Sequence, residues 1–239
     1  MRLRHIKGAE ELIANNRFVI QEPKAMRGSW HSVFSDAASE QIIKDPATLH
    51  MGEDSSRIDE PLIHPLHIEV GTGKGRFITE LAAANPDIDY IGIENHSSVL
   101  LKAVKKLEDR DLPNLRFILM DAIAIEEVFA PGEVDRIYLN FSDPWPKERH
   151  AKRRLPSRQF LARFHNILRD EGIIEFKTDN RELFDFALDE LKLSDFVLID
   201  KTYDLHNDDR MNAGNIMTEY EERFSSIGNP ICKYVIRRR

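Results

Sequence analysis

From residue 66 to the end of the chain, short apolar runs alternate with segments whose apolar residues recur at helical spacing. After residue 97, for example, Leu100, Ala103, Val104 and Leu107 fall on one face of a helix. Short strands that alternate with amphipathic helices are typical of a doubly wound α/β sheet, in which ligands bind beyond the carboxyl ends of the strands. We therefore predict seven strands, at residues 66–70, 90–94, 115–120, 134–139, 172–177, 196–201 and 231–236.

The first 61 residues lack this alternation. We expect residues 1–34 to form an N-terminal arm with partial order. Residues 35–61 contain seven acidic side chains, two basic ones and almost no aromatic ones, which predicts a mobile insertion. The expected organisation is therefore an arm with an acidic insertion over residues 1–61 and one globular domain over residues 62–239.

The composition is that of a soluble globular protein, with 41% hydrophobic residues, 31% charged residues and a net charge of −7. No apolar run approaches the ~18–20 residues of a membrane span, and the N-terminus lacks the apolar core of a signal peptide. We expect a cytoplasmic protein with no membrane partner. The single cysteine, Cys232, excludes an intramolecular disulfide and a cysteine-rich metal site, and we expect no bound metal.

A glycine-rich turn, residues 71–75, follows the first predicted strand. Gly75 is followed by Arg76, so the turn lacks the Gly-Lys-Ser/Thr of a phosphate-binding P-loop. Its spacing also differs from that of a dinucleotide site, whose pyrophosphate the preceding Glu69 would repel. S-adenosylmethionine fits better, because its sulfonium and ammonium groups favour a nearby acid and its carboxylate can be held by amides of the turn at Gly71 and Gly73.

Acidic residues also follow the next three predicted strands. Glu94 is placed to accept hydrogen bonds from both ribose hydroxyls, as an acid does at this point in nucleotide-binding sheets. Asp121 is placed to accept from the adenine amino group, and Asp143 lies where this fold presents a transferable methyl group. A structural turn flanked by solvated acids is the alternative interpretation.

Asp143 lies in the sequence Asn-Phe-Ser-Asp-Pro-Trp-Pro-Lys, which is followed by a strongly basic run. Pro144 and Pro146 restrict φ, so we expect a stiff loop. Trp145 has two interpretations, a platform on which a base stacks or a cover for the edge of the core. The basic run would bind phosphates, although a solvated helix start is the alternative. It contains Lys147, Arg149, His150, Lys152, Arg153 and Arg154.

Two later segments place acids where they can face a base. The fifth predicted strand ends at Phe-Lys-Thr-Asp-Asn, which contains Asp179, and residues 217–224 combine acids with a threonine and a tyrosine. Acids that face a base accept hydrogen bonds from its N–H groups, and guanine offers N1–H and the N2 amino group. For residues 217–224, a charged helix start is the alternative.

In this order, these motifs resemble those of the bacterial tRNA (guanine-N7-)-methyltransferase family, from residue 1 to about residue 237. The resemblance rests on Glu-Val-Gly-Thr-Gly-Lys-Gly, Tyr-Ile-Gly-Ile-Glu, the Asp143 loop with its basic tail, Phe-Lys-Thr-Asp-Asn and Asn-Ile-Met-Thr-Glu-Tyr-Glu. It implies a Rossmann-like methyltransferase domain over residues 62–239, with the last strand antiparallel. It also implies methyl transfer from S-adenosylmethionine to N7 of the variable-loop guanine of tRNA, by a monomer or a homodimer.

The resemblance further implies roles for single residues. Glu69, Glu94, Asp121 and Asp143 would line the cofactor side, and Asp143 would also be the active-site residue. Residues 149–154 would contact RNA, and residues 35–61 are longer than the usual connection in the family. The implied substrate-binding residues are Lys147, Asp179, Thr218, Glu219, Tyr220 and Glu221.

Guanine N7 carries a lone pair and no proton, so the reaction needs alignment and electrostatic stabilisation rather than a base that deprotonates the nucleophile. An RNA methyltransferase directed at an amino group is a second hypothesis. Such enzymes carry an Asp/Asn-Pro-Pro-aromatic motif after the fourth strand, whereas here Trp145 stands at the position of the second proline. A non-catalytic RNA-binding scaffold is the third hypothesis.

Overall fold

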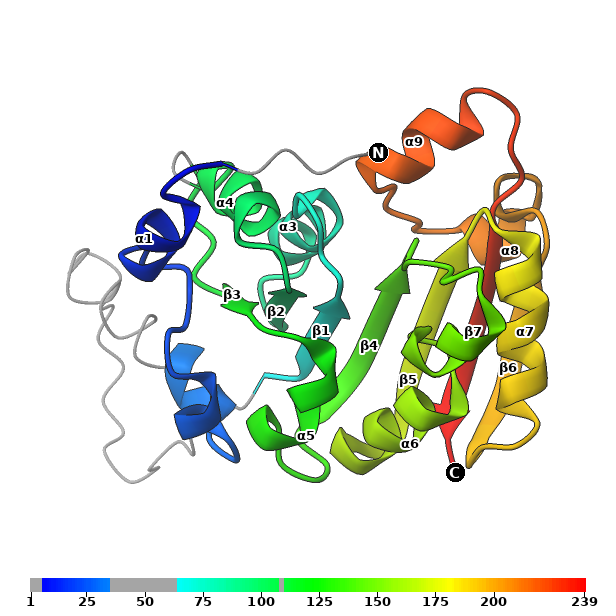
Figure 1. Cartoon of the computed structure of the whole chain (residues 1–239), viewed down its shortest axis with the longest axis horizontal. Helices are drawn as coiled ribbons and strands as arrows, with labels where there is room; N and C mark the ends of the chain where they lie inside the picture. Colours follow the sequence, from blue (N-terminus) through cyan, green and yellow to red (C-terminus); the bar gives the residue numbers. More distant parts are fainter. Residues whose placement is uncertain (1–5, 35–63, 108–109) are drawn as a thin grey trace, which may run out of the picture.

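The computed structural model describes residues 6–34, 64–107 and 110–239 and contains a central seven-stranded sheet (Figure 1). All seven predicted strands are present, and the largest shift is at the start of β5, which begins at Leu168 instead of residue 172. The strand order in the sheet is β3-β2-β1-β4-β5-β7-β6. The strands are β1 (Leu66–Val70), β2 (Asp89–Glu94), β3 (Leu115–Leu119), β4 (Val134–Asn140), β5 (Leu168–Thr178), β6 (Phe196–Thr202) and β7 (Cys232–Arg238).

The strands β1 to β5 pair in parallel, and β7 runs antiparallel to its neighbours β5 and β6. Six strands therefore share one direction and only the last is reversed, which confirms the predicted fold class. The chain moves outward from β1 through β2 to β3 and then returns to β4 on the other side of β1. This reversal places the topological switch point between β1 and β4, where open α/β sheets bind ligands.

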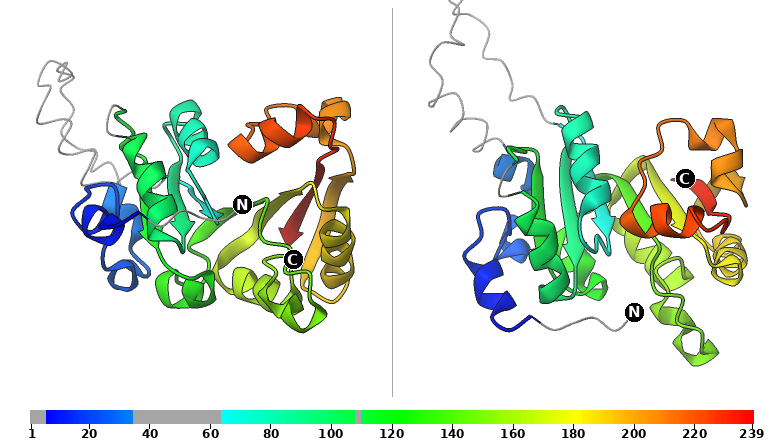
Figure 2. Two further views of the ribbon diagram at one scale, coloured as in Figure 1. Left: turned by 45° about the horizontal axis from the view of Figure 1, so that its top comes forward. Right: turned by 90° about the horizontal axis from the view of Figure 1, so that it is seen from above.

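Helices cover both faces of the sheet (Figure 2). The helices α1, α3 and α4 pack on one face around Tyr90 and Phe117. The helices α5, α6 and α7 pack on the other face around the apolar side chains of β1 and β4. The helix bounds are α1 (Ala9–Ala14), α3 (Arg76–Ala84), α4 (Ser97–Lys105), α5 (Ile125–Val128), α6 (Arg158–Ile167), α7 (Arg181–Leu191), α8 (Asp209–Asn212) and α9 (Glu219–Ser225), and η4 (Glu148–Arg153) is a 3₁₀ helix.

The described part of the N-terminal arm, residues 6–34, packs along the β3 edge of the sheet. Val19 forms a parallel bridge with Phe117, which covers an edge strand that would otherwise expose unpaired backbone groups. Trp30 is fully buried, and its indole N–H donates to the carbonyl oxygen of Val128 at 3.0 Å. This packing was not evident from the sequence. The predicted mobile insertion at residues 35–61 and the predicted boundary between residues 61 and 62 lie outside the described residues.

Among the described residues, no helix combines the length and the apolar character needed to cross a membrane. The same part of the chain holds no group of three or more His, Cys, Asp or Glu side chains that could bind a metal ion.

Candidate active site

The turn after β1 is shaped by glycines in the left-handed region, with φ of +83° at Gly71, +60° at Gly73 and +77° at Gly75. Residues with a side chain rarely adopt these angles. Gly75 also packs closely on α4, because a Cβ added there would lie 2.7 Å from Cβ of Ala103. The glycines therefore bring the start of α3 close to α4 at the switch point.

The amide groups of this turn are mostly engaged within the protein. The amides of Gly71 and Thr72 both donate to the carbonyl oxygen of Ile93, at 2.8 and 2.9 Å. The amide of Gly73 donates to Glu94 at 3.0 Å. The donors available for a ligand carboxylate therefore include those in the first turn of α3, which have no acceptor within the helix.

Glu69 lies directly beneath the turn and is only 1% exposed. One carboxylate oxygen accepts from the hydroxyl of Thr72 at 2.6 Å, and the other accepts from Nδ2 of Asn140 at 2.8 Å. Burial raises the pKa of the Glu69 carboxyl to about 7, although the two hydrogen bonds act in the opposite direction. The group therefore joins the end of β1 to the end of β4 and changes charge near neutral pH.

Glu94, at the end of β2, is 7% exposed and stabilises the turns on either side of it. Besides the amide of Gly73, its carboxylate accepts from the amides of Asn95 and His96 at 3.0 and 2.9 Å. A carboxylate offers about four acceptor positions, so Glu94 retains capacity for a ligand hydroxyl. Its position is fixed by three backbone groups, which makes it a pre-organised acceptor.

Asp121 and Asp143 follow β3 and β4 and are both exposed. The Asp121 carboxylate caps a short 3₁₀ turn by accepting from the amide of Ile123 at 2.9 Å. Asp143 lies between two residues in left-handed conformations, Phe141 with φ +52° and Trp145 with φ +41°. Because β1 to β4 are parallel, the strand-end acids and the glycine turn all lie at the same edge of the sheet.

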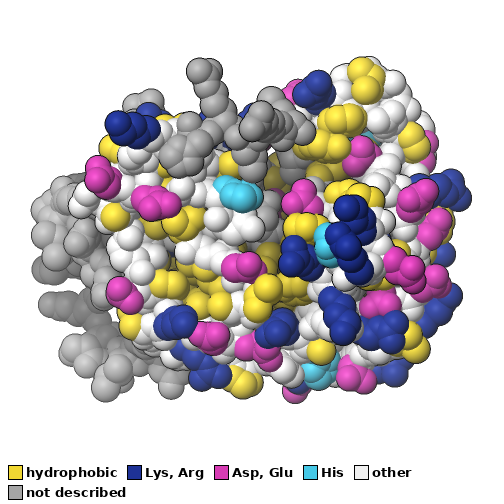
Figure 3. Space-filling model, viewed as in Figure 1, with side chains coloured by type: hydrophobic (Ala, Val, Ile, Leu, Met, Phe, Trp, Pro, Cys, Tyr) yellow, Lys and Arg dark blue, Asp and Glu magenta, His cyan; other side chains and the backbone are white. Residues whose placement is uncertain are grey.

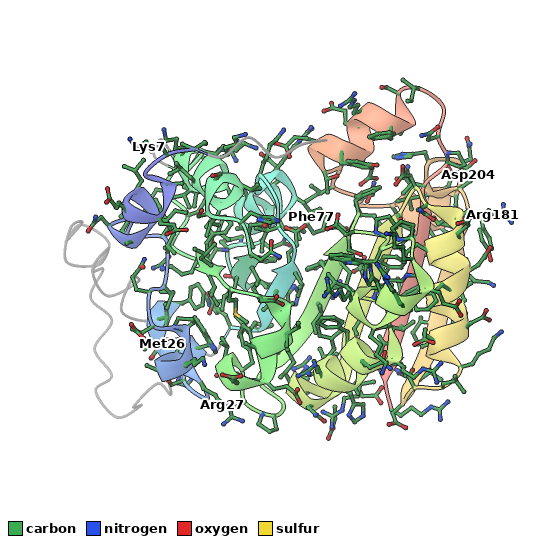
Figure 4. The ribbon with its side chains drawn as sticks, in the orientation of Figure 1. Lys7, Met26, Arg27, Phe77, Arg181 and Asp204 are labelled. Atoms are coloured by element: carbon green, nitrogen blue, oxygen red, sulfur yellow. The ribbon has the colours of Figure 1, made fainter. Side chains whose placement is uncertain are left out.

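A buried ion pair between Lys177 of β5 and Glu221 of α9 holds α9 above this edge (Figure 1). The Lys177 ammonium donates to Glu221 at 2.6 Å, to Oδ1 of Asn215 at 3.1 Å and to the carbonyl oxygen of Ile216 at 3.0 Å. It also lies 4.9 Å from the ring centre of Phe77 in α3, a residue labelled in Figure 4. Burial lowers the pKa of Lys177, and the negative charge of Glu221 opposes that shift.

The expected substrate residues of α9 point in different directions. Glu221 is fully buried and paired with Lys177, and Glu219 pairs with Lys106 after α4. The Thr218 hydroxyl caps α9 by accepting from the amide of Glu221 at 2.9 Å. Only Tyr220 reaches Asp179, to which its hydroxyl donates at 3.3 Å.

Tyr220 also links α9 to the Asp143 loop. Its ring lies 5.0 Å from that of Phe141 and 4.1 Å from that of Phe224, and Asp179 lies at the end of β5 next to β4. Asp143, Asp179 and Tyr220 therefore belong to one contiguous part of the site, on the opposite side of the switch point from Glu94 and Asp121.

The basic run lies on and around η4, after the Asp143 loop, and Figure 3 shows Lys and Arg side chains gathered on this face. Lys147, Arg149 and Lys152 are exposed. Arg154 instead turns inward and donates to the carbonyl oxygen of Trp145. The Trp145 ring packs against Arg153 and His150.

Three residues that the sequence did not single out complete the site. Thr72 and Asn140 donate to Glu69, and Lys177 fixes α9. A usable signal existed for Asn140 and Lys177, because each is a polar residue at the end of an otherwise apolar strand. Nothing in the sequence indicated which acid pairs with Lys177.

The arrangement is a nucleoside site next to a second, acid-lined site. A helix start for an anionic group, a buried acid for a cationic group and an acceptor for hydroxyls lie on the β1–β3 side. On the β4–β5 side, the exposed Asp143 and the half-buried Asp179 lie beside a cationic surface. This combination suits transfer of a cationic donor group to a nucleic-acid base.

Comparison with known proteins agrees with this chemistry. The family described as "Putative methyltransferase" matches residues 63–234. The tRNA (guanine-N(7)-)-methyltransferase of Lachnoclostridium phytofermentans is 51% identical over 98% of this chain and 97% of its own length, and that of Bacillus licheniformis is 45% identical over 98% and 97%. The crystal structure of the 16S rRNA methyltransferase KamB has a TM-score of 0.57 at 16% identity, over 80% of this chain and 96% of KamB, and so shares the fold. The chain therefore belongs to the tRNA (guanine-N(7)-)-methyltransferase family.

Proposed function

We propose that this enzyme transfers a methyl group from S-adenosylmethionine to N7 of a guanine in the variable loop of tRNA. The observation that carries the proposal is the shared edge of the sheet, where the glycine turn and Glu94 lie on one side and Asp143 and Asp179 on the other. The membership of the chain in this family supports the same reaction. The described site residues all come from one chain, so the proposal does not require a second copy. Because tRNA is the substrate, we place the reaction in the cytoplasm.

The residues on the β1–β3 side fit S-adenosylmethionine. The first turn of α3 would hold its carboxylate, and Glu69 would face its positively charged groups. Glu94 would accept from the ribose hydroxyls and Asp121 from the adenine amino group. When bound, S-adenosylmethionine supplies an electrophilic methyl group on a sulfonium.

The residues on the β4–β5 side would orient guanine. N7 needs no deprotonation, so Asp143 and Asp179 act by accepting from the N1–H and N2 amino groups and by offsetting the positive charge that develops on the ring. Tyr220, which contacts both Asp179 and the Asp143 loop, would help to hold the two acids in a fixed orientation. Holding N7 in line with the methyl group is the main contribution of these residues to the rate.

The exposed basic residues would bind the tRNA backbone. Lys147, Arg149 and Lys152 carry their charge at the surface beside the Asp143 loop, where phosphate contacts can place a base over the site without reading its sequence. The whole chain carries a net charge of −7, so this cationic surface is a local feature of an acidic protein and binding of a polyanion is confined to it.

Methyl transfer to two unmodified tRNA transcripts tests the proposal. One transcript carries the variable-loop guanine and the other carries adenine at that position. We expect transfer from labelled S-adenosylmethionine to the first transcript only, and chain cleavage at the methylated position after borohydride and aniline treatment, which detects N7-methylguanosine. Label without cleavage would indicate an amino-directed enzyme. Binding of tRNA without binding of S-adenosylmethionine in calorimetry would indicate a scaffold.

A further inference from the structure

The loop that carries Asp143 is strained on both sides of the acid. Phe141 and Trp145, two residues before and two residues after Asp143, have φ angles of +52° and +41°. Both are bulky residues, for which the left-handed region is unfavourable. Such conformations persist only where surrounding contacts enforce them, and they cluster at functional sites. The contacts that enforce them are therefore the ones that position Asp143.

The first strained residue is held by β5 and α9. The amide of Phe141 donates to the carbonyl oxygen of Lys177 at 2.8 Å. The Phe141 ring lies 5.0 Å from the ring of Tyr220, with an interplanar angle of 38°. This half of the loop is thus attached to the substrate side of the site.

The second strained residue is held by Arg154. The guanidinium donates from Nε and Nη2 to the carbonyl oxygen of Trp145, at 3.3 and 3.1 Å. One face of the guanidinium lies 4.3 Å from the ring centre of Phe186 in α7. The backbone of Arg154 is fixed as well, because its carbonyl oxygen accepts from the amide of Ser157 at 2.9 Å at the start of α6.

Arg154 therefore differs from its neighbours in the basic run. Lys152 and Arg153 are exposed, whereas Arg154 is half-buried between the loop and α7. A planar guanidinium can make a forked contact to one oxygen while it stacks on a ring, which an ammonium cannot reproduce. The geometry requires an arginine at this position for a reason other than charge.

We propose that Arg154 is a positioning residue for methyl transfer, which holds the left-handed turn at Trp145 and thereby sets the position of Asp143. The inference rests on the proposed function, in which Asp143 orients the guanine. It assigns Arg154 to the Asp143 loop rather than to the tRNA backbone. Lys152, which lies in the 3₁₀ helix η4 two residues before Arg154, serves as the matched phosphate-binding residue.

Three variants separate the two roles: Arg154→Met, Arg154→Lys and the control Lys152→Met. For Lys152→Met we expect weaker tRNA binding. The negative slope of log K against log salt should become shallower by about 0.7–0.9, the value for one lost phosphate contact. For Arg154→Met we expect an unchanged salt slope and a single-turnover rate at saturating tRNA that falls at least about tenfold. Arg154→Lys, which keeps the charge, should remain slow because an ammonium lacks the fork.

A readout without tRNA keeps the inference separate from the proposed function. The chain has two tryptophans, and Trp30 is fully buried, so Trp145 dominates quenching of fluorescence by acrylamide. Quenching should increase in Arg154→Met and stay at the wild-type level in Lys152→Met, while S-adenosylmethionine binding by calorimetry shows that each variant is folded. Two results together would overturn the proposal: equal quenching in the two variants, and a salt slope that becomes shallower in Arg154→Met as it does in Lys152→Met. Arg154 would then be a phosphate contact. Failure of the wild type to methylate tRNA would instead refute the proposed function.

Discussion

Replacing Lys177 by methionine should destabilise the protein strongly, because the change leaves a buried charge without its partner. Glu221 is 0% exposed and Lys177 is 3% exposed. The variant removes the 2.6 Å contact to Glu221 and two further hydrogen bonds, to Asn215 and Ile216. Breaking a buried pair by removing one partner costs about 3–5 kcal/mol. For a chain of this size, that corresponds to a fall in Tm of about 6–20 °C.

A double-mutant cycle provides the control. Lys177→Met combined with Glu221→Leu removes both charges, and an apolar pair of similar volume is often neutral or stabilising relative to a buried ion pair. Urea unfolding followed by circular dichroism should show the double variant to be more stable than Lys177→Met alone, with an unchanged m-value. A cost below about 1 kcal/mol for Lys177→Met, or strictly additive costs in the double variant, would refute the reasoning.

Three further predictions concern the cofactor side and the acid loop. Because the pKa of Glu69 is about 7 and a cationic ligand favours the ionised form, calorimetry should show that S-adenosylmethionine affinity rises through neutral pH, and Glu69→Gln should flatten this profile. The raised pKa also means that the unfolded carboxyl ionises before the folded one. The free enzyme should therefore lose stability as the pH rises from 4.5 to about 7. Asp143→Asn should lower kcat by about 100-fold with little change in S-adenosylmethionine affinity, whereas equal losses would indicate a binding role. Gly75→Ala should lower the free energy of unfolding in urea by about 2–4 kcal/mol, since it adds a close contact with α4 to the strained φ. Gly73→Ala, with nothing within 4 Å of an added Cβ, should lower it by only about 1–2 kcal/mol. Similar costs for the two variants would contradict the packing argument.

Much of the cofactor side could be predicted from the sequence, because it is built from local units. Each unit is a strand, a turn and a helix, and its hydrophobic pattern marks where the strand stops. Parallel strands bring their carboxyl ends to one edge, so Glu69, Glu94 and Asp121 could be expected together before the structure was known. The strand bounds depended on partners instead: β5 extends back to Leu168 because Leu168 pairs with Val134, across an irregularity that the apolar pattern does not record.

The substrate side could be predicted only in part, because it depends on contacts between distant segments. Lys177 and Glu221 are separated by 44 positions, and no periodic pattern indicates that an acid in a charged helix start is the buried one. Likewise, the charge pattern groups Arg154 with the other basic residues of the run and does not indicate that its guanidinium contacts the carbonyl oxygen of Trp145. Trp30 shows the same limit, since its buried position depends on the loop that contains Val128.

This difference bears on how the two halves of the site respond to substitution. The glycine turn is enforced by its own backbone conformation and by the backbone of β2. Because α9 also forms ion pairs with Arg76 and Lys106, a change in α9 that keeps these two pairs should leave the Glu94 side intact. The Asp143 loop has no such independence, because Phe141 is held through Lys177 and Tyr220 and Trp145 is held through Arg154. Substitutions in β5, α9 or the basic run that reach this loop should therefore lower the rate of methyl transfer while S-adenosylmethionine binding persists. That separation follows from which contacts are local and which are tertiary.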